Sequence, residues 1–346
     1  MQKFKKGILV SFLIVAMLML VVGCGGSQES PDDSANQGAT GEQPAEQQEE
    51  TLKVGLLLPG NVNDKGWNAS AYEGLVAAEQ EYGVEIAYQE AVTQSDMEEV
   101  FRSYATSGYN LIIGHGFQFS DAAAKVAEEF PDVKFVILNG ATSNGRNLAS
   151  YSFTNWEPGY VAGYLAGLLT ETNKIGAIGA QQTAVIEDAL NAFAQAAKEA
   201  NPSADVTITY VDSWDDVAKG KETALAMIDN GADVVTCNAN AVGLGAIEAA
   251  KERGTYHIGF VDDQFPVAPE VVVASAIQSN QEMVKLIVRE TLADNFNPAE
   301  NVIGIKDGVE GISSFHDWED KLDKEIIDKV KQIEQDIIDG KITFKK

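Results

Sequence analysis

LKVGLLLPGNVNDKGWNASAYEGLVAAEQEYGVEIAYQE, residues 52–90, predicts one complete strand–helix–strand unit. A short apolar run at Val54–Leu58 is typical of a buried strand, and a second run follows at Val84–Tyr88. Between them, Ser70–Tyr82 has the length and the apolar spacing of a helix. Because two strands joined by a crossover helix run parallel, this stretch predicts an α/β fold.

The same alternation continues in two series, which predicts two doubly wound, Rossmann-like lobes with a cleft at the carboxyl ends of their strands. The first series adds strands at Leu111–Ile113 and Phe135–Leu138 and helices at Asp96–Ser107 and Asp121–Phe130. The second series predicts strands at Ile175–Ile178, Val206–Val211, Val234–Cys237 and Ile258–Val261, with helices near Val185–Ala200, Val217–Asn230 and Leu244–Arg253.

Several crossings are expected to join the lobes. A strand at Leu148–Phe153 crosses from the first lobe, and a helix rich in Gly, Ala and Leu at Tyr160–Thr170 opens the second. The chain is expected to return to the first lobe at Val271–Ile277, with a helix near Glu282–Leu292 and a strand at Val302–Ile305. The predicted boundaries are 52–152 and about 265–315 for the first lobe, 153–264 for the second, and 316–346 for a C-terminal part with a charged helix at Trp318–Ile338.

The N-terminus predicts a bacterial lipoprotein export signal over residues 1–23. Lysines precede an apolar run at Ile8–Val22, which is shorter than the roughly 20 residues of a membrane-spanning helix, and Gly23 precedes Cys24. In this interpretation Cys24 carries a lipid that anchors the protein to the extracytoplasmic face of the cell membrane. The alternative is an ordinary anchor helix with an incidental cysteine.

Residues 24–51 then form the lipidated cysteine and a flexible tether. From Gly25 to Glu50 the chain is mostly Gly, Ser, Gln, Pro, Asp and Glu, and it has too little apolar surface to offset the entropy of ordering. This composition favours a spacer that holds the folded body away from the bilayer.

The charge argues against one class of function, and the cysteine content excludes one kind of cross-link. The formal net charge of -27 argues against nucleic-acid binding, which needs clustered Lys and Arg for phosphate contacts. Cys237 is the only cysteine besides Cys24, so the folded body contains no internal disulfide and depends on core packing.

Two tryptophans stand in loops that follow predicted strands, one in each lobe. Trp67 lies between polar residues just before the first helix, and Trp214 follows the strand at Val206–Val211. Their indoles can stack on both faces of one planar ring, while Asn and Asp side chains hydrogen-bond its edge. The alternative for Trp67 is a loop tryptophan that packs on its own helix.

Motifs spread along nearly the whole body resemble the basic membrane protein family. They are Asn63-Asp64-Lys65-Gly66-Trp67-Asn68 with Tyr72-Glu73-Gly74, Gly114-His115-Gly116-Phe117, Phe130-Pro131-Asp132-Val133-Lys134-Phe135, Gly159-Tyr160-Val161-Ala162-Gly163, Gly231-Ala232-Asp233-Val234 and Asp263-Gln264.

The resemblance implies a type I periplasmic-binding-protein fold, with two lobes that close on a purine and an aromatic from each lobe, here Trp67 and Trp214, stacked on the base. It implies a substrate-binding lipoprotein of an ABC importer, similar to purine nucleoside receptors. Its partners would be a permease and a separate ATPase, and it would act as a monomer without a cofactor. Closure on the ligand makes and breaks no bond, so no enzyme activity is expected.

Departures from the family pattern point to the ligand. Relatives hold ribose with an Asp where this chain has Asn139, carry a Lys near Gln278, and have a further Asp where this chain has Val261. With fewer charged anchors for sugar hydroxyls, a free nucleobase or another planar heterocycle fits as readily as a nucleoside. Glu90 and Asp64 could accept hydrogen bonds from an exocyclic amine, which suits adenine.

The remaining candidates are polar or aromatic residues of the same loops. His115 could hydrogen-bond a ring nitrogen or only stabilise a turn. The full predicted ligand site is Asn63, Asp64, Trp67, Asn68, Glu90, His115, Phe117, Asn139, Trp214, Asn238, Asp263 and Gln278. The three histidines lack metal-ligand spacing, so no metal site is expected.

Other patterns favour structural roles. Gly243-Leu244-Gly245 lacks the third glycine of a dinucleotide fingerprint and indicates close packing of a helix against a strand. Asp212, Asp215 and Asp216 are interpreted as a helix cap rather than a cation site. A ligand-sensing lipoprotein of the same fold and a sugar receptor remain the alternative functions.

Overall fold

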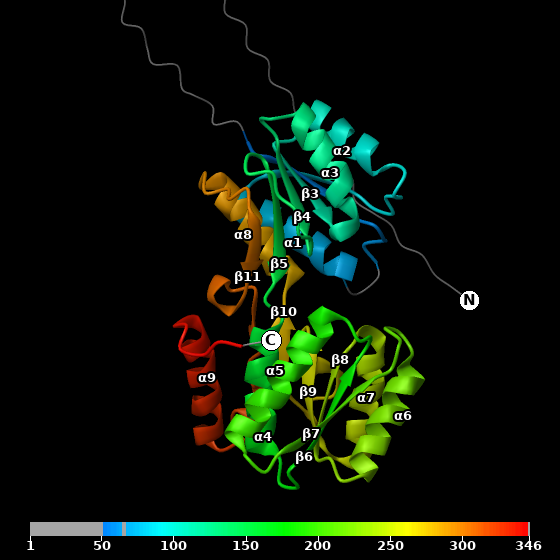
Figure 1. Ribbon diagram of the computed structural model, residues 1–346, viewed down its shortest axis with the longest axis vertical. Coiled ribbons are helices and arrows are strands. Elements are labelled where there is room, and N and C mark those ends of the chain that lie inside the picture. The colour runs from blue at the N-terminus through cyan, green and yellow to red at the C-terminus, as the bar shows by residue number, and fades with distance from the viewer. Residues whose placement is uncertain (1–50, 64–66, 345–346) are drawn as a thin grey trace, which may run out of the picture. The chain divides into compact units, whose positions relative to one another are not determined.

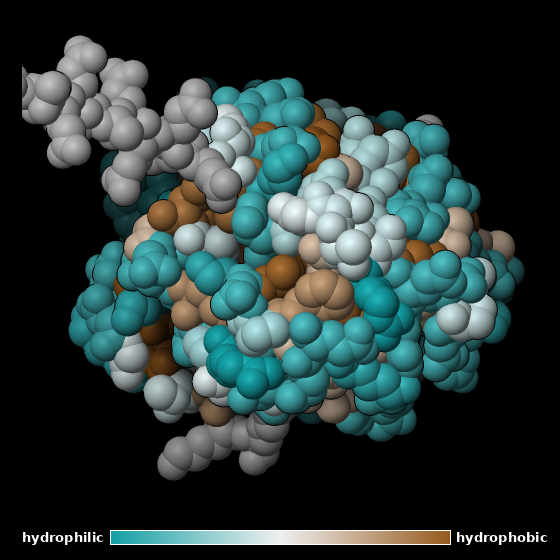
Figure 2. All heavy atoms as spheres, turned by 90° about the horizontal axis from the view of Figure 1, so that it is seen from above, coloured by the Kyte–Doolittle hydropathy of each residue, from teal (hydrophilic) through white to brown (hydrophobic). Residues whose placement is uncertain are grey.

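Two six-stranded sheets flanked by helices form the folded part of the chain (Figure 1). A computed structural model describes residues 51–63 and 67–344 of the 346. The predicted export signal, Cys24, the tether and Asp64 lie outside the described residues. The face in Figure 2 is mostly hydrophilic, with apolar residues in separate patches.

The first sheet has the strand order β11-β5-β4-β3-β1-β2, and all its pairings are parallel. Helices α1 and α8 bury their apolar sides against one face, and α2 and α3 against the other. The strands are β1 Lys53–Leu57, β2 Glu85–Gln89, β3 Leu111–His115, β4 Lys134–Leu138, β5 Leu148–Phe153 and β11 Glu300–Ile303. The helices are α1 Trp67–Tyr82, α2 Met97–Thr106, α3 Ser120–Glu129 and α8 Asn280–Leu292, with a 3-10 turn, η1, at Phe117–Phe119.

The second sheet has the order β12-β10-β9-β8-β6-β7, in which only β12 pairs antiparallel. Helices α4, α5 and α9 pack with this sheet in one hydrophobic core. Helices α6 and α7 pack with it in a second hydrophobic core. The strands are β6 Lys174–Gly179, β7 Asp205–Tyr210, β8 Val234–Asn238, β9 Tyr256–Val261, β10 Val272–Gln278 and β12 Glu310–Ile312. The helices are α4 Trp156–Leu169, α5 Ala184–Ala200, α6 Val217–Asp229, α7 Asn240–Arg253 and α9 Lys324–Ile338. Short 3-10 turns stand at Phe265–Val267 (η2), Ile305–Asp307 (η3) and His316–Trp318 (η4).

The predicted α/β fold with two doubly wound lobes is confirmed, and the eight strands of the two predicted series are all present. One placement was wrong. The strand predicted at Val271–Ile277 was assigned to the first lobe, but β10 pairs with β9 in the second sheet. An apolar run shows that a strand is buried and does not show which neighbour it pairs with. The predicted terminal helix is also shorter, because α9 begins only at Lys324.

In the described chain, the two sheets are joined by three crossing segments. One connects β5 to α4 at Thr154–Asn155, one connects β10 to α8 at Ser279, and one runs from β11 to β12 through residues 304–309. Because β5 and β10 leave their sheets at their carboxyl ends, both sheets turn these ends of their parallel strands towards the crossing segments. The loops at these ends are therefore the place where a ligand would meet both lobes.

Candidate functional site

Backbone hydrogen bonds gather the loops at the carboxyl ends of the first sheet. The N–H of Leu58 donates to the carbonyl of Gln89 over 2.9 Å, and that of Ala91 donates to Gly60 over 3.2 Å. On the other side, the N–H of Gly116 donates to Leu138 over 3.0 Å. The predicted site residues that follow β1, β2, β3 and β4 therefore share one edge of the sheet.

Trp67 and His115 form a stacked pair at this edge. Their ring centroids lie 3.6 Å apart with 29° between the planes. Nε2 of His115 is 3.0 Å from the carbonyl oxygen of Trp67, and because a carbonyl only accepts, Nε2 carries the proton. His115 is fully buried, whereas 36% of Trp67 remains exposed. The indole thus has a backing ring on one side and open surface for a ligand.

The other predicted residues of the β1 and β2 loops have mixed roles. Glu90 accepts a hydrogen bond from the N–H of Val62 over 2.9 Å, so one carboxylate oxygen fixes the β1 loop instead of facing a ligand. Asn63 is exposed, and the amide of Asn68 lies against Gly60, where a Cβ atom would come within 2.7 Å of its Nδ2. Phe117, in η1, is 74% exposed and is available for contact.

Asn139 follows β4 in a left-handed conformation with φ of 54°. Its Nδ2 donates to Oδ1 of Asn280 over 3.3 Å, and Asn280 is 4% exposed at the start of α8. Asn adopts this conformation more readily than most other residues, because its short polar side chain can hydrogen-bond locally. Asn280 was missed from the sequence, because no motif marks a residue that holds a loop 141 positions away in the chain.

On the second lobe, Trp214 and Asn238 lie in neighbouring loops. Trp214 is half-buried against both cores of the second sheet, and its carbonyl accepts from the N–H of Val242 over 3.2 Å. Asn238 ends β8, is 4% exposed, and accepts from the N–H of Ala180 over 3.2 Å. These contacts place both residues at the carboxyl ends of β6, β7 and β8.

The acidic run after β7 contains the expected helix cap. Oδ1 of Asp216 accepts from the N–H of Lys219 over 3.0 Å at the start of α6, which confirms the capping role for that residue. Among the residues that the structure describes, no three His, Cys, Asp or Glu side chains are grouped as metal ligands would be.

The loop after β9 brings Asp263 to the C-terminal part of the chain. Its Oδ2 lies 2.6 Å from Nε2 of His316, and the imidazole stacks on Phe265 with centroids 4.2 Å apart. Asp262, beside it, has a raised pKa because it is partly removed from water and because Glu73 adds negative charge. Since Glu73 stands on α1, the β9 loop of the second lobe faces α1 of the first.

Val261 ends β9 with φ of 75°, although it is β-branched. Such a conformation is strained for valine and indicates that the surrounding structure fixes it. It is the position at which the family resemblance implies an Asp.

Gln278 ends β10, and its amide bonds to two residues that were not predicted as part of the site. Its Nε2 donates to Oδ1 of Asn155 over 3.0 Å and to Oε1 of Glu310 over 2.9 Å. Asn155 belongs to the first crossing segment and Glu310 directly follows the third, so the amide of Gln278 is a component of the hinge. Sequence reasoning missed Asn155 and Glu310, because a single acidic residue in a short strand gives no sign that it is buried.

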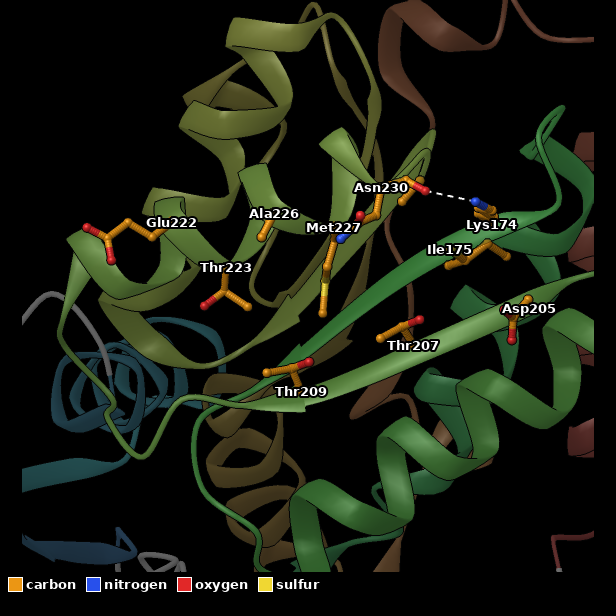
Figure 3. Close-up of a pocket in the computed structure, with 11 residues that line it drawn as sticks. Lys174, Ile175, Asp205, Thr207, Thr209, Glu222, Thr223, Ala226, Met227 and Asn230 are labelled. Carbon is orange, nitrogen blue, oxygen red and sulfur yellow. Dashed lines mark hydrogen bonds between the residues drawn. The ribbon is translucent and has the colours of Figure 1, made fainter.

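A cavity of about 630 Å³ lies away from these loops, in the second lobe between β7 and α6 (Figure 3). Thr207 and Thr209 on the edge strand and Met227 on the helix point into it, and Lys174 donates to the carbonyl of Asn230 over 2.9 Å at one end. It contains none of the predicted site residues, and it arises where α6 leaves the outermost strand uncovered.

Comparison with known proteins identifies relatives along the whole folded body. Residues 51–346 match a family described as ABC transporter substrate-binding protein, PnrA-like. The ABC transporter nucleoside-binding protein BmpA of Lactococcus lactis is 31% identical over 98% of each chain. Transcriptional activator protein med of Bacillus subtilis is 29% identical over 76% of this chain and 82% of its own.

A solved structure shares the fold. The solute-binding protein of an ABC transporter system from Aeropyrum pernix superposes with a TM-score of 0.70 and 23% identity, over 85% of this chain and 93% of that one. The arrangement of two sheets with crossing segments is thus the type I periplasmic-binding fold. Within the described residues, no helix is both long enough and apolar enough to span a membrane.

Proposed function

Because the chain belongs to the family of PnrA-like ABC transporter substrate-binding proteins, we propose that it captures a purine base or nucleoside between its lobes. The observation that carries this proposal is Trp67, an exposed indole at the strand ends of the first lobe, with Trp214 at the strand ends of the second. Two such rings can hold one planar heterocycle from both sides. The nucleoside-binding name of the Lactococcus relative supports the same ligand class.

A free base is favoured over a nucleoside, with adenine as the first candidate because Oε1 of Glu90, whose Oε2 accepts from Val62, could accept from its exocyclic amine. The amide of Gln278 is engaged with Asn155 and Glu310, and Val261 offers no hydrogen-bonding group to a sugar hydroxyl. Three positions distinguish this chain from ribose-binding relatives, and of these only Asn139 is then left to contact a ribose hydroxyl. A pocket with few polar partners for ribose loses little by binding the base alone.

The proposed mechanism is capture by closure. Ligand contacts from both lobes favour the closed form, and a permease recognises that form while a separate ATPase supplies the energy. No bond is made or broken, so the protein is proposed to have no enzyme activity. A lipid on Cys24 would keep the receptor at the extracytoplasmic face of the membrane, close to its permease.

Calorimetric titration after unfolding and refolding, which removes carried ligand, tests the proposal. The panel is adenine, adenosine, guanosine, hypoxanthine, riboflavin and ribose. Tight binding of a purine is expected, with adenine bound at least as tightly as adenosine. Binding of ribose alone, or of no compound in the panel, would overturn the purine assignment.

A sensing role is the second candidate, and the similarity to transcriptional activator protein med favours it. A sensor and a transport receptor would bind the same ligand in the same way. Deletion of the gene separates them, because loss of a receptor abolishes uptake of the radiolabelled ligand and loss of a sensor leaves uptake intact.

A further inference from the structure

Glu310 is a buried carboxyl group at the point where the three crossing segments meet. It begins β12, and 5% of the residue is exposed. Oε1 accepts from the N–H of Asn155 over 3.1 Å and from Nε2 of Gln278 over 2.9 Å. Oε2 accepts from the hydroxyl of Thr154. One carboxyl group therefore ties the segment before α4 and the end of β10 to the segment before β12.

No positive charge balances this carboxyl group among its described hydrogen-bond partners, which are all neutral. An ionisable neighbour that acts on Glu310 is Glu157 on α4, whose Oε2 accepts from the N–H of Ile305 over 2.7 Å. Asp307, in η3, accepts from the N–H of Gly304 over 3.0 Å and adds negative charge near Glu157. The pKa of Glu310 is raised to about 7, mainly by burial and to a smaller extent by the negative charge of Glu157, while the three hydrogen bonds that favour its charged form oppose the rise.

The hydrogen-bond network accommodates a proton on Glu310 when the hydroxyl of Thr154 turns its own proton away from Oε2. A protonated Oε2 can donate to Oγ1 of Thr154, because a hydroxyl both donates and accepts. Oε1 then remains a carbonyl oxygen that keeps the bonds from Asn155 and Gln278. Ionisation, in contrast, leaves a charge out of contact with water and without a counter-ion.

We propose that Glu310 is a positioning residue of the hinge. It holds a proton in the arrangement of lobes seen here, and its ionisation favours a second arrangement in which water hydrates the carboxylate. A hydrated carboxylate titrates near its ordinary value of 4.5. By linkage, a rise in pH from about 4.5 towards 7 shifts the population of molecules to the second arrangement. The shift levels off above pH 7. This inference concerns the hinge alone and does not depend on which ligand binds.

Distances between spin labels on the two lobes test the proposal without ligand. Asp132, between α3 and β4, and Ser203, between α5 and β7, are exposed positions for a D132C/S203C pair. Cys24 is changed to Ser, and Cys237 is buried and does not compete for label. In the otherwise native full-length chain, the distance distribution should change between pH 5.5 and pH 7 and stay constant above pH 7.5.

Glu310→Gln should abolish this change, because the variant cannot ionise. Glu334→Gln is the matched control: Glu334 on α9 also has a raised pKa through burial and accepts from the N–H of Ile312 on β12 over 3.1 Å, but lies outside the crossing segments. That control should keep the pH response.

A second variant keeps the test decisive if Glu310→Gln fails to fold. Gln278→Met removes one donor to the carboxylate, which disfavours the charged form and should move the response to higher pH. A distance distribution that is constant from pH 5.5 to 8.5 in the native chain would overturn the proposal. A response that persists in Glu310→Gln, or that is unmoved in Gln278→Met, would do the same.

Discussion

The indole of Trp67 rests on the imidazole of His115, with ring centroids 3.6 Å apart, while Nε2–H of the same imidazole donates to the Trp67 carbonyl. His115 therefore holds both the ring and the backbone of the residue that begins α1. One face of the indole is supported by a buried group, and the rest remains accessible. An aromatic fixed in this way loses little conformational freedom when a ligand stacks on it.

Trp67→Ala should weaken purine binding at least tenfold, about 1.4 kcal/mol, since a stacking contact and its buried area are both lost. The free energy of unfolding should change little, because Trp67 is partly exposed at a helix start and its backbone contact to His115 is kept. Calorimetry and urea unfolding of the same preparation measure the two effects. Trp67→Phe is the matched variant and should retain most of the affinity. An affinity within twofold of the native value in Trp67→Ala would remove this residue from the site.

Asn139→Asp should shift preference from adenine towards adenosine by about tenfold. A carboxylate accepts hydrogen bonds from ribose hydroxyls, and such charged hydrogen bonds contribute about 1.5 to 3 kcal/mol. The left-handed backbone at this position suits Asp as well as Asn, and Asn280 can present its amide nitrogen to the new carboxylate. Calorimetry with both compounds on both proteins gives the ratio. An equal change for base and nucleoside would show that Asn139 does not face the sugar position.

The regular part of the fold was readable from the sequence because it rests on local patterns. Apolar runs such as Val234–Cys237 identify buried strands, and α5 shows the apolar spacing of a helix that packs on a sheet. The pairing of β10 was not readable, since its apolar run suits either sheet and the chain crosses only after Gln278. Sheet membership depends on contacts between segments far apart in the sequence.

The gathering of loops at one edge of the first sheet was readable for a related reason. Loops that follow parallel strands meet at one edge, so Trp67, His115 and Asn139 could be grouped from the order of elements alone. The hinge was not readable, because Glu310 acquires its burial and its three hydrogen bonds only when separate crossing segments meet. Nothing in the sequence therefore indicated that the amide of Gln278 bonds to Glu310.

Glu310→Gln should also change the pH dependence of stability. The pKa of Glu310 is raised from 4.5 to about 7 in the folded protein, so between these values the folded state binds more protons than the unfolded state. The free energy of unfolding of the native chain therefore falls as the pH rises through this window, by up to about 3 kcal/mol from this group, because a second arrangement that hydrates the carboxylate relieves part of the loss. The variant lacks this loss, so its stability relative to the native chain should grow by that amount between pH 4.5 and pH 8. Urea unfolding at a series of pH values measures the difference, and a constant offset between the proteins would contradict the raised pKa.

Two glycines of α7, two positions apart, should respond in opposite ways to alanine. The Gly243-Leu244-Gly245 pattern predicted close packing against a strand, but the close neighbour is the backbone of α6: a Cβ on Gly245 would overlap the carbonyl oxygen of Val217 and come within 2.7 Å of the nitrogen of Lys221. Backbone atoms of a packed helix cannot give way cheaply, so Gly245→Ala should cost about 1 to 3 kcal/mol of stability. A Cβ on Gly243 meets nothing nearer than 3.7 Å, so Gly243→Ala should stabilise by about 0.5 to 1 kcal/mol, because alanine loses less backbone entropy on folding than glycine does. Urea unfolding of the two variants compares them directly, and equal effects would mean that the approach of α6 to α7 is not what requires glycine.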